Sequence, residues 1–194
     1  MKRLLLILIL TFSFQSWVKA DDIRDFQIEG MSIGDSLLDY FSEDEIKIKL
    51  NNANFTTKKQ YSIITIPKLS TSSKYDTVSI TLKSNDKKYK IFTIDGILYY
   101  NNNIKKCYKE QDIVVKEISN LFPEITPSKG KIRKHRADKT GKTTVKNRSF
   151  RLSKGLISIG CNDWSKDLTN KKGWKDALRI GIVSQEYLDT YKLN

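Results

Sequence analysis

The chain has very few residues that bind metals or act as catalytic bases. Two cysteines, Cys107 and Cys161, and a single histidine, His135, are found among 194 residues. A structural zinc site normally uses four sulfur or nitrogen ligands, and the glycine-rich fingerprint of a dinucleotide-binding loop is also missing. We therefore expect no metal and no cofactor, and the sequence alone identifies no catalytic residue.

Long apolar runs are also missing, except at the N-terminus. After a basic start, residues 4–14 are apolar apart from two hydroxyl-bearing residues, and a small residue precedes Asp21. As a helix this run would extend about 16 Å, against about 30 Å for the hydrocarbon core of a membrane. Residues 1–20 therefore have the layout of a cleaved signal peptide, and an uncleaved anchor is the alternative. We expect an exported protein, periplasmic or extracellular, with no transmembrane segment in residues 21–194.

Acidic residues are scarce relative to basic ones. The sequence holds 35 Lys and Arg against 22 Asp and Glu, a formal net charge of +13. Removing residues 1–20, which carry three Lys and Arg and no acid, leaves +10. Most of this charge lies in residues 128–148, where nine Lys and Arg accompany one acid. Such clusters attract polyanions in a salt-sensitive manner.

Residues 128–148, called the basic segment below, are the main candidate binding site. The segment lacks the aromatic residues on which single-strand binders stack bases, so we expect no nucleic acid. An anionic component of the cell envelope or a protein is the expected partner, and a solvated loop without a ligand is the alternative. The cations expected to hold an anion are Lys129, Lys131, Arg133, Lys134, Arg136, Lys139 and Lys142.

The two cysteines are expected to form a disulfide, because an even pair in an exported protein is normally oxidised. Cys107 lies on the apolar face of a predicted helix and Cys161 on that of a predicted strand, so a helix packed across a sheet would bring them together. The bond would close a loop of 55 residues. The chain-entropy model gives such a loop about 4 kcal/mol of stabilisation.

Capping residues and apolar spacing predict four helices. Sequences with the spacing of a capping box, at residues 32–35 and 42–45, predict a pair of short helices near the N-terminus. Apolar residues three and four apart predict a long helix over residues 104–122, which Pro123 ends. A short terminal helix is expected after Ser184.

Alternation of apolar and polar residues predicts an antiparallel sheet of five to seven strands. The segments with this pattern are 61–66, 77–83, 89–94, 97–100, 149–152, 156–161 and 178–183. Asp95-Gly96 is a strong signal for a tight hairpin between two of them, and one long strand with a bulge at Gly96 is the alternative. Residues 51–60 and 163–173 are expected to be a polar linker and a polar loop.

Two further sets of residues are candidates for function. His135 with Asp138 and other loop carboxylates would be the acid–base group of a hydrolase, but a nucleophile in suitable geometry cannot be identified from sequence. An exposed loop histidine is the alternative. A set of four aromatic residues either lines a ligand groove or packs in the core and at its rim. These residues are Tyr99, Tyr100, Trp164 and Trp174.

Three stretches of the chain carry a resemblance to known proteins. They are Gly30-Met31-Ser32-Ile33-Gly34-Asp35-Ser36-Leu37-Leu38, the run from His135 to Lys142, and Cys161-Asn162-Asp163-Trp164-Ser165. Together they resemble small secreted proteins of unknown function from AT-rich marine bacteria. The resemblance implies export and an α+β fold, and it implies no activity and no site residue. The Gly-Met-Ser start is also similar to that of small outer-membrane assembly lipoproteins, but their lipid-bearing cysteine is absent here.

The sequence thus predicts one α+β domain over residues 21–194. A mostly antiparallel sheet packs against one long helix, with a short N-terminal helix pair and a basic loop at residues 128–148. The expected function is that of a non-enzymatic envelope protein that binds an anionic partner. A secreted hydrolase that uses His135 and loop carboxylates, and a structural scaffold module, are the alternatives.

Overall fold

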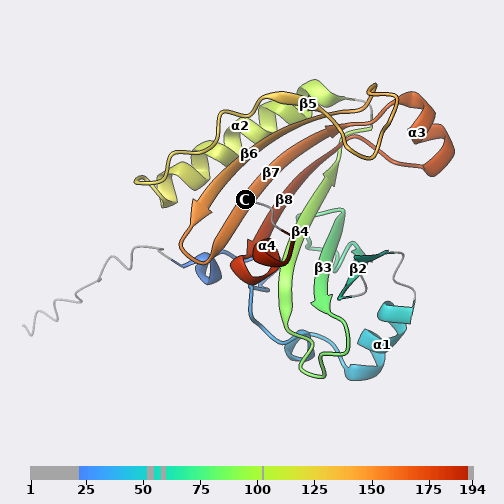
Figure 1. Cartoon of the computed structure of the whole chain (residues 1–194), viewed down its shortest axis with the longest axis vertical. Helices are drawn as coiled ribbons and strands as arrows, with labels where there is room; N and C mark the ends of the chain where they lie inside the picture. Colours follow the sequence, from blue (N-terminus) through green and yellow to red (C-terminus); the bar gives the residue numbers. More distant parts are fainter. Residues whose placement is uncertain (1–21, 52–54, 58–59, 102, 192–194) are drawn as a thin grey trace, which may run out of the picture.

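An antiparallel sheet of eight strands forms the body of the molecule (Figure 1). The computed structural model describes residues 22–51, 55–57, 60–101 and 103–191. Within these residues the order of strands across the sheet is β1-β2-β3-β4-β8-β7-β6-β5. The expected signal peptide lies outside the described residues.

The elements confirm the α+β class and the antiparallel sheet. The strands are β1 (Phe55–Thr57), β2 (Tyr61–Pro67), β3 (Thr77–Lys83), β4 (Ile91–Tyr99), β5 (Ile132–Lys134), β6 (Thr144–Leu152), β7 (Gly155–Asp163) and β8 (Ala177–Ser184). The helices are α1 (Glu43–Asn51), α2 (Ile104–Leu121), α3 (Lys166–Lys172) and α4 (Gln185–Tyr191), and the 3-10 turns are η1 (Ile23–Asp25) and η2 (Leu37–Asp39). The count of strands exceeds the expected range because the three-residue strands β1 and β5 lie in segments expected to be linker and loop.

Alternation of side chains gives the sheet one apolar and one polar face. A row of cross-strand partners on the apolar face is completely buried: Ile64, Ile80, Ile94, Ile182, Ile157 and Phe150. The neighbouring row on the polar face is Thr65, Ser79, Asp95, Gly181, Ser158 and Ser149. The apolar row belongs to the hydrophobic core, and Thr65 and Ser79 of the polar row line a groove described below.

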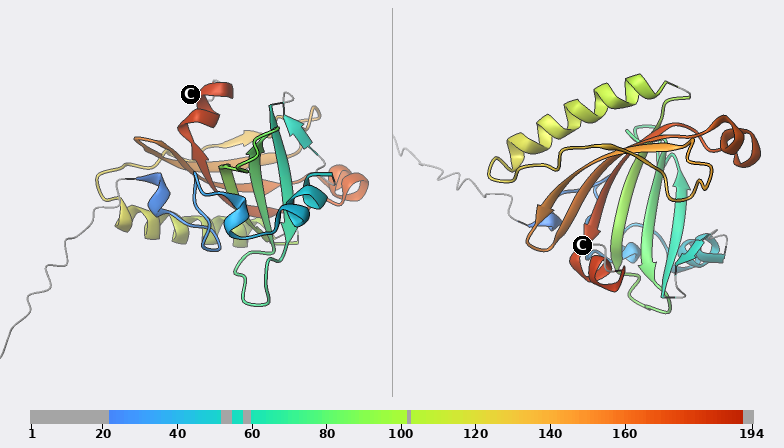
Figure 2. Two further views of the ribbon diagram at one scale, coloured as in Figure 1. Left: turned by 90° about the horizontal axis from the view of Figure 1, so that it is seen from below. Right: turned by 45° about the horizontal axis from the view of Figure 1, so that its top comes forward.

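Helices α2 and α4 lie on opposite sides of the sheet (Figure 2). On the α2 side, Cys107 forms a disulfide with Cys161 of β7, with the two Cα atoms 6.0 Å apart. Close by, the buried side-chain amide of Gln111 donates hydrogen bonds to the carbonyl oxygens of Ile159, at 2.7 Å, and Lys146, at 2.8 Å. The predicted disulfide is therefore confirmed, and the same helix also hydrogen-bonds strands β6 and β7.

The two predicted capping boxes have different outcomes. Ser42 and Glu45 form the second one: the backbone N–H of Ser42 donates to the Glu45 carboxylate at 2.9 Å, and α1 follows. At the first, the Asp35 carboxylate accepts the backbone N–H of Ser32 at 2.8 Å, but the Ser32 hydroxyl donates to two backbone carbonyls of the N-terminal segment instead of capping a helix. Gly34 then takes a φ of +94°, which ends any helix there. The first expected helix is reduced to the turn η2.

The Asp95-Gly96 hairpin is not formed. Both residues lie inside β4, a single strand that pairs with β3 on one side and β8 on the other. Gly96 is opposite Val78 and Ile180 in regular register, and the bulge in this strand lies at Phe92 instead. A Cβ atom at position 96 would overlap the ring of Tyr75, which packs over the glycine. Glycine is therefore present for close packing and not for a turn.

Candidate functional site

The basic segment is partly β-structure and not a continuous loop. Residues 132–134 form the outermost strand β5, and β6 begins at Thr144, so only residues 135–143 connect strands. The backbone N–H of Ser128 also donates to the carbonyl of Ser149 in β6 at 2.9 Å. This pairing satisfies backbone groups that the edge of β6 would otherwise expose, which is why the expected loop is largely ordered along that edge.

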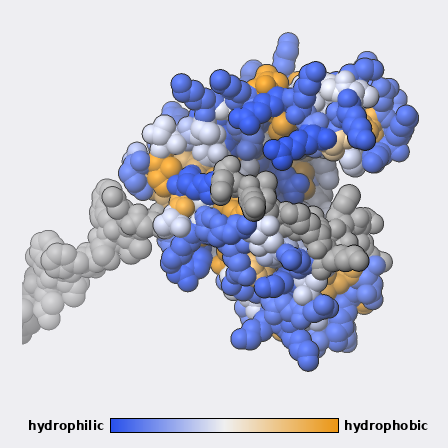
Figure 3. Space-filling model, viewed as in Figure 1, coloured by the Kyte–Doolittle hydropathy of each residue, from blue (hydrophilic) through white to orange (hydrophobic). Residues whose placement is uncertain are grey.

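All seven cations predicted to bind an anion are exposed. Lys129 and Lys131 precede β5, Arg133 and Lys134 belong to it, and Arg136, Lys139 and Lys142 lie in the connecting turn. Only Lys142 has an ion pair in the described part of the chain, with Asp167 of α3 at 3.3 Å. Hydrophilic side chains cover most of the surface over β5, β6 and α3 in the space-filling view (Figure 3).

The cations of β5 do not form one flat patch. Arg133 is opposite Val145 and Lys134 is opposite Thr144. Consecutive side chains of a strand point to opposite faces, so Arg133 lies on the polar face of the sheet and Lys134 on the other. The positive charge therefore surrounds the edge of the sheet.

Asp138 organises the turn that follows β5. Its carboxylate accepts hydrogen bonds from the N–H and hydroxyl of Thr140, at 2.9 and 2.6 Å, and from the same groups of Thr143, at 2.9 and 2.7 Å. These bonds, led by those from Thr140, hold the pKa of Asp138 well below its usual range. The hydroxyl of Thr143 also accepts the backbone N–H of Ser165 at 3.1 Å. The turn is thereby attached to the start of α3.

The side chain of His135 contacts groups other than the Asp138 carboxylate. Its Nδ1 accepts the backbone N–H of Ala137 at 3.1 Å, and its ring lies against Trp164 with ring centroids 4.6 Å apart. Burial lowers the pKa of His135, which favours the neutral imidazole, although Asp138 acts in the opposite direction. The carboxylate that a catalytic dyad would use to orient the histidine is hydrogen-bonded to the two threonines.

His135, Trp164 and Trp174 form a row of three rings in contact, here called a stack, in which neighbouring ring planes are inclined at 57° and 53°. The centroids of the two indoles are 4.4 Å apart. The backbone of Trp164 is held by the buried Asp176, which accepts its N–H at 2.9 Å. This stack connects the basic segment to the end of the sheet where α3 lies.

An open groove of about 590 Å³ lies on the polar face beside this stack. Three of the four predicted aromatic residues line it, namely Tyr99, Trp164 and Trp174. Tyr100 does not, because it packs against the hydrophobic core. The lining also includes hydroxyl and amide side chains from three strands, namely Thr65, Ser79 and Asn162, and apolar side chains of Ile63, Ile97 and Ala177.

Among the described residues, the charged ones that line the groove are Lys175 and Arg179, and no carboxylate is in this lining. Arg179 donates to Asp95 at 2.8 Å, yet 45% of its side chain is exposed. Lys175 lies over the ring of Tyr99, with its Nζ 5.5 Å from the centroid. The groove therefore offers aromatic surface, hydroxyl groups and positive charge together.

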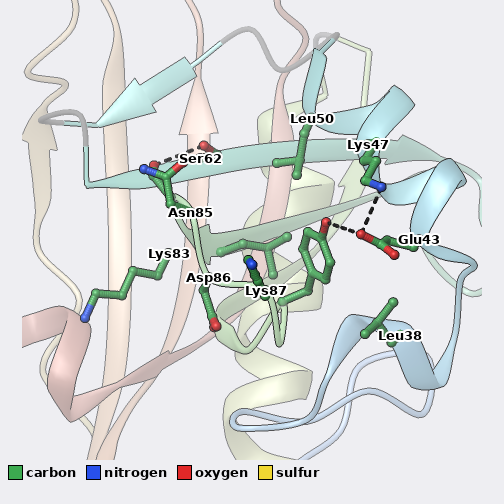
Figure 4. Close-up of a pocket in the computed structure, with 12 residues that line it drawn as sticks. Leu38, Glu43, Lys47, Leu50, Ser62, Lys83, Asn85, Asp86 and Lys87 are labelled. Atoms are coloured by element: carbon green, nitrogen blue, oxygen red, sulfur yellow. Dashed lines mark hydrogen bonds and ion pairs between the residues drawn. The ribbon is translucent and has the colours of Figure 1, made fainter.

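A second hollow, of about 760 Å³, lies between α1, η2 and the β2–β3 side of the sheet (Figure 4). Leu38 and Leu50 supply apolar surface, and Glu43 pairs with Lys47 at 2.9 Å. The Tyr89 hydroxyl donates to the same Glu43 at 3.4 Å. The carboxylate of Glu43 is thus already paired.

The described residues contain no group of three or more His, Cys, Asp and Glu side chains that would hold a metal ion. In the same part of the chain, no helix has the length and apolar composition needed to cross a membrane. Both findings concern these residues alone.

Sequence reasoning missed α3, the helix between Trp164 and Trp174. Residues 163–173 were expected to be a polar loop, but Lys166–Lys172 is helical. The signals were present: Ser165 caps the helix by accepting the N–H of Leu168 at 3.4 Å, and Gly173 ends it with a φ of +67°. The helix has no buried residue, so the apolar stripe that reveals most helices is absent.

Comparison with known proteins gives no relative. The chain matches no protein-family model, no curated protein and no solved structure.

Proposed function

We propose that this protein is exported and binds an anionic component of the cell envelope through the basic segment, without catalysing a reaction. One observation carries the proposal: six of the seven exposed cations have no ion pair in the described part of the chain. An anionic surface would gain their attraction without displacing an internal carboxylate. Each basic side chain near an acidic membrane surface contributes about 1 kcal/mol.

The structure of the segment supports a preformed binding surface. β5 is hydrogen-bonded along the edge of β6, and the following turn is fixed by Asp138 and Thr143. The cations therefore extend from an ordered backbone, and little backbone entropy is lost when a ligand binds.

Export is supported by the sequence and by the disulfide. Residues 1–20 have the order of regions found in a signal peptide. The Cys107–Cys161 bond is typical of proteins that fold in an oxidising compartment.

We also infer a scaffold role for α2 within this protein. Its buried residues Cys107, Val115 and Ile118 belong to the same hydrophobic core as the apolar face of the sheet. In this role α2 covers that face and holds β6 and β7 in place, so the basic edge is presented on a rigid frame.

The proposal is tested by measuring sedimentation of residues 21–194 with lipid vesicles. Binding is expected with vesicles that contain phosphatidylglycerol, to be lost at high salt, and to be absent with pure phosphatidylcholine. A soluble polyphosphate added as competitor separates attraction to lipid from attraction to phosphate groups in general. Binding that is absent, or that does not depend on salt, would contradict the proposal.

Two matched variants locate the binding surface. Replacing Lys131, Arg133 and Lys134 with glutamine should weaken vesicle binding by about two orders of magnitude. The control replaces three exposed lysines of α2, with the same change in net charge, and should weaken it much less. Those residues are Lys105, Lys109 and Lys116. Equal losses in both variants would show attraction by net charge alone.

A further inference from the structure

The groove on the polar face has a composition that the basic segment does not explain. The indole rings of Trp164 and Trp174 are in contact at one end, inclined at 53°, and Tyr99 lies on its rim with 38% of its surface exposed. Its volume of about 590 Å³ lies within the range of about 300–1,000 Å³ found for small-ligand sites.

We propose that this groove binds a short acidic oligosaccharide. The ligand's sugar rings lie against the indole of Trp174 and the ring of Tyr99. Its acidic group lies between Lys175 and Arg179. The inference does not depend on the proposed function of the basic segment, because it rests on different residues.

The aromatic and hydroxyl groups select a ligand with apolar ring faces and polar edges. A pyranose ring has C–H groups on its faces and hydroxyl groups around its edge, and Trp and Tyr likewise combine flat apolar surface with a polar tip. Thr65 and Ser79 are cross-strand partners in β2 and β3, and Asn162 lies on β7. All three line the groove and can both donate and accept hydrogen bonds. A purely apolar ligand would leave these groups without partners.

The charges select an acidic ligand. Lys175 and Arg179 line the groove, and in the part of the chain that the structure describes no carboxylate lines it. Asp95 takes one donor of the Arg179 guanidinium, and guanidinium has five N–H donors, so others remain for a carboxylate or sulfate. Lys172 adds a third cation beside Trp174, with its Nζ 4.8 Å from the ring centroid.

The test compares two trisaccharides that differ only at C6, trigalacturonate with a carboxylate there and the galactose trimer of the same linkage with a hydroxymethyl group. Titration calorimetry and tryptophan fluorescence of residues 21–194 measure both affinities. Trigalacturonate is expected to bind about tenfold or more tightly than the neutral trimer, since charge-assisted hydrogen bonds are the stronger ones. No binding of either trimer at millimolar concentration, or equal binding of both, would overturn the proposal.

Variants place the ligand in the groove. Trp174→Ala should weaken trigalacturonate binding about tenfold, whereas Trp174→Phe, which keeps a flat ring, should retain most of it. Lys175→Gln should reduce the preference for the acidic trimer over the neutral one. Folding of each variant is checked by its NMR spectrum. A folded Trp174→Ala variant with unchanged affinity would contradict the inference.

The basic-segment variant with glutamine at positions 131, 133 and 134 separates the two proposals. It should bind trigalacturonate as the natural sequence does, even though its vesicle binding is lost. If it loses trisaccharide binding as well, the sugar binds at the basic segment and the groove proposal is wrong. If vesicle binding is absent from the start while trisaccharide binding follows Trp174, only the groove proposal stands.

Discussion

The guanidinium of Arg179 in β8 donates a hydrogen bond to Oδ2 of Asp95 in β4 at 2.8 Å, across the polar face of the sheet. Asp95 is directly opposite Gly181, and a Cβ atom at position 181 would overlap the Asp95 carboxylate. The glycine in β8 thus leaves the space that the aspartate occupies. The ion pair therefore lies beside the groove, and its carboxylate comes from the interior of strand β4.

The Asp95–Arg179 pair should contribute modestly to stability. Because 45% of the Arg179 side chain is exposed, we expect a coupling energy of about 0.5–1 kcal/mol, as for other solvent-exposed pairs. A double-mutant cycle with Asp95→Asn and Arg179→Gln, measured by urea unfolding, isolates this coupling energy. Additive effects of the two changes would show that the pair contributes nothing.

Gly96→Ala should destabilise the fold by about 1–3 kcal/mol, the usual cost of an added methyl group in a packed site. The new Cβ would overlap the ring of Tyr75, and the backbone at position 96 needs no special φ. The matched experiment repeats the change in a Tyr75→Ala background, where the cost should largely disappear. If the cost is the same in both backgrounds, the tyrosine is not its cause.

Loss of the Cys107–Cys161 disulfide should lower the free energy of unfolding by up to about 4 kcal/mol. The bond joins α2 to β7, so residues 149–194 should lose protection before β2, β3 and β4 do. Hydrogen exchange of the Cys107→Ser, Cys161→Ser double variant at neutral pH measures this order. Uniform loss of protection across the sheet would contradict it.

Asp138→Asn should reduce the dependence of stability on acid pH. In the folded protein the hydrogen bonds from Thr140 and Thr143 hold the pKa of Asp138 below its ordinary value, which is about 3.9 in an unfolded chain. The stabilisation is therefore complete above the unfolded pKa and is lost as the pH falls toward the folded pKa.

Urea unfolding between about pH 6 and about pH 2 measures this change. The Asn variant should be less stable at neutral pH and should show a shallower loss on acidification. Some acid dependence should remain, since Arg24 and Lys154 hold the pKa of Asp22 low in the same way. An unchanged pH profile would rule out Asp138 as a contributor.

The local sequence predicted the structure correctly where the conformation of a segment depends mainly on its own residues. The alternation in residues 77–83, the apolar stripe of residues 104–122 and the capping box at Ser42 each appear in the structure as predicted. The Cys107–Cys161 pairing followed from the faces on which the two cysteines lie. Burial and hydrogen bonding act over a few neighbouring residues in the three elements, whereas the disulfide joins residues separated by 54 positions.

The local sequence led to wrong predictions where a residue distant in the chain contacts the segment. Asp95-Gly96 has the composition of a turn, but Tyr75 packs over Gly96 and Arg179 pairs with Asp95. The Ser32 hydroxyl binds carbonyls of the N-terminal segment and does not cap a helix. Tertiary contacts outweigh local propensities of this size.

By itself the sequence determined the fold class, the disulfide and the concentration of positive charge in residues 128–148, because composition and side-chain periodicity fix which surfaces are buried. Only the tertiary structure decided that β5 pairs along the sheet edge, and that Tyr99, Trp164 and Trp174 meet at one groove while Tyr100 joins the core. These residues are far apart in the chain, and strand register and the position of α3 bring them together.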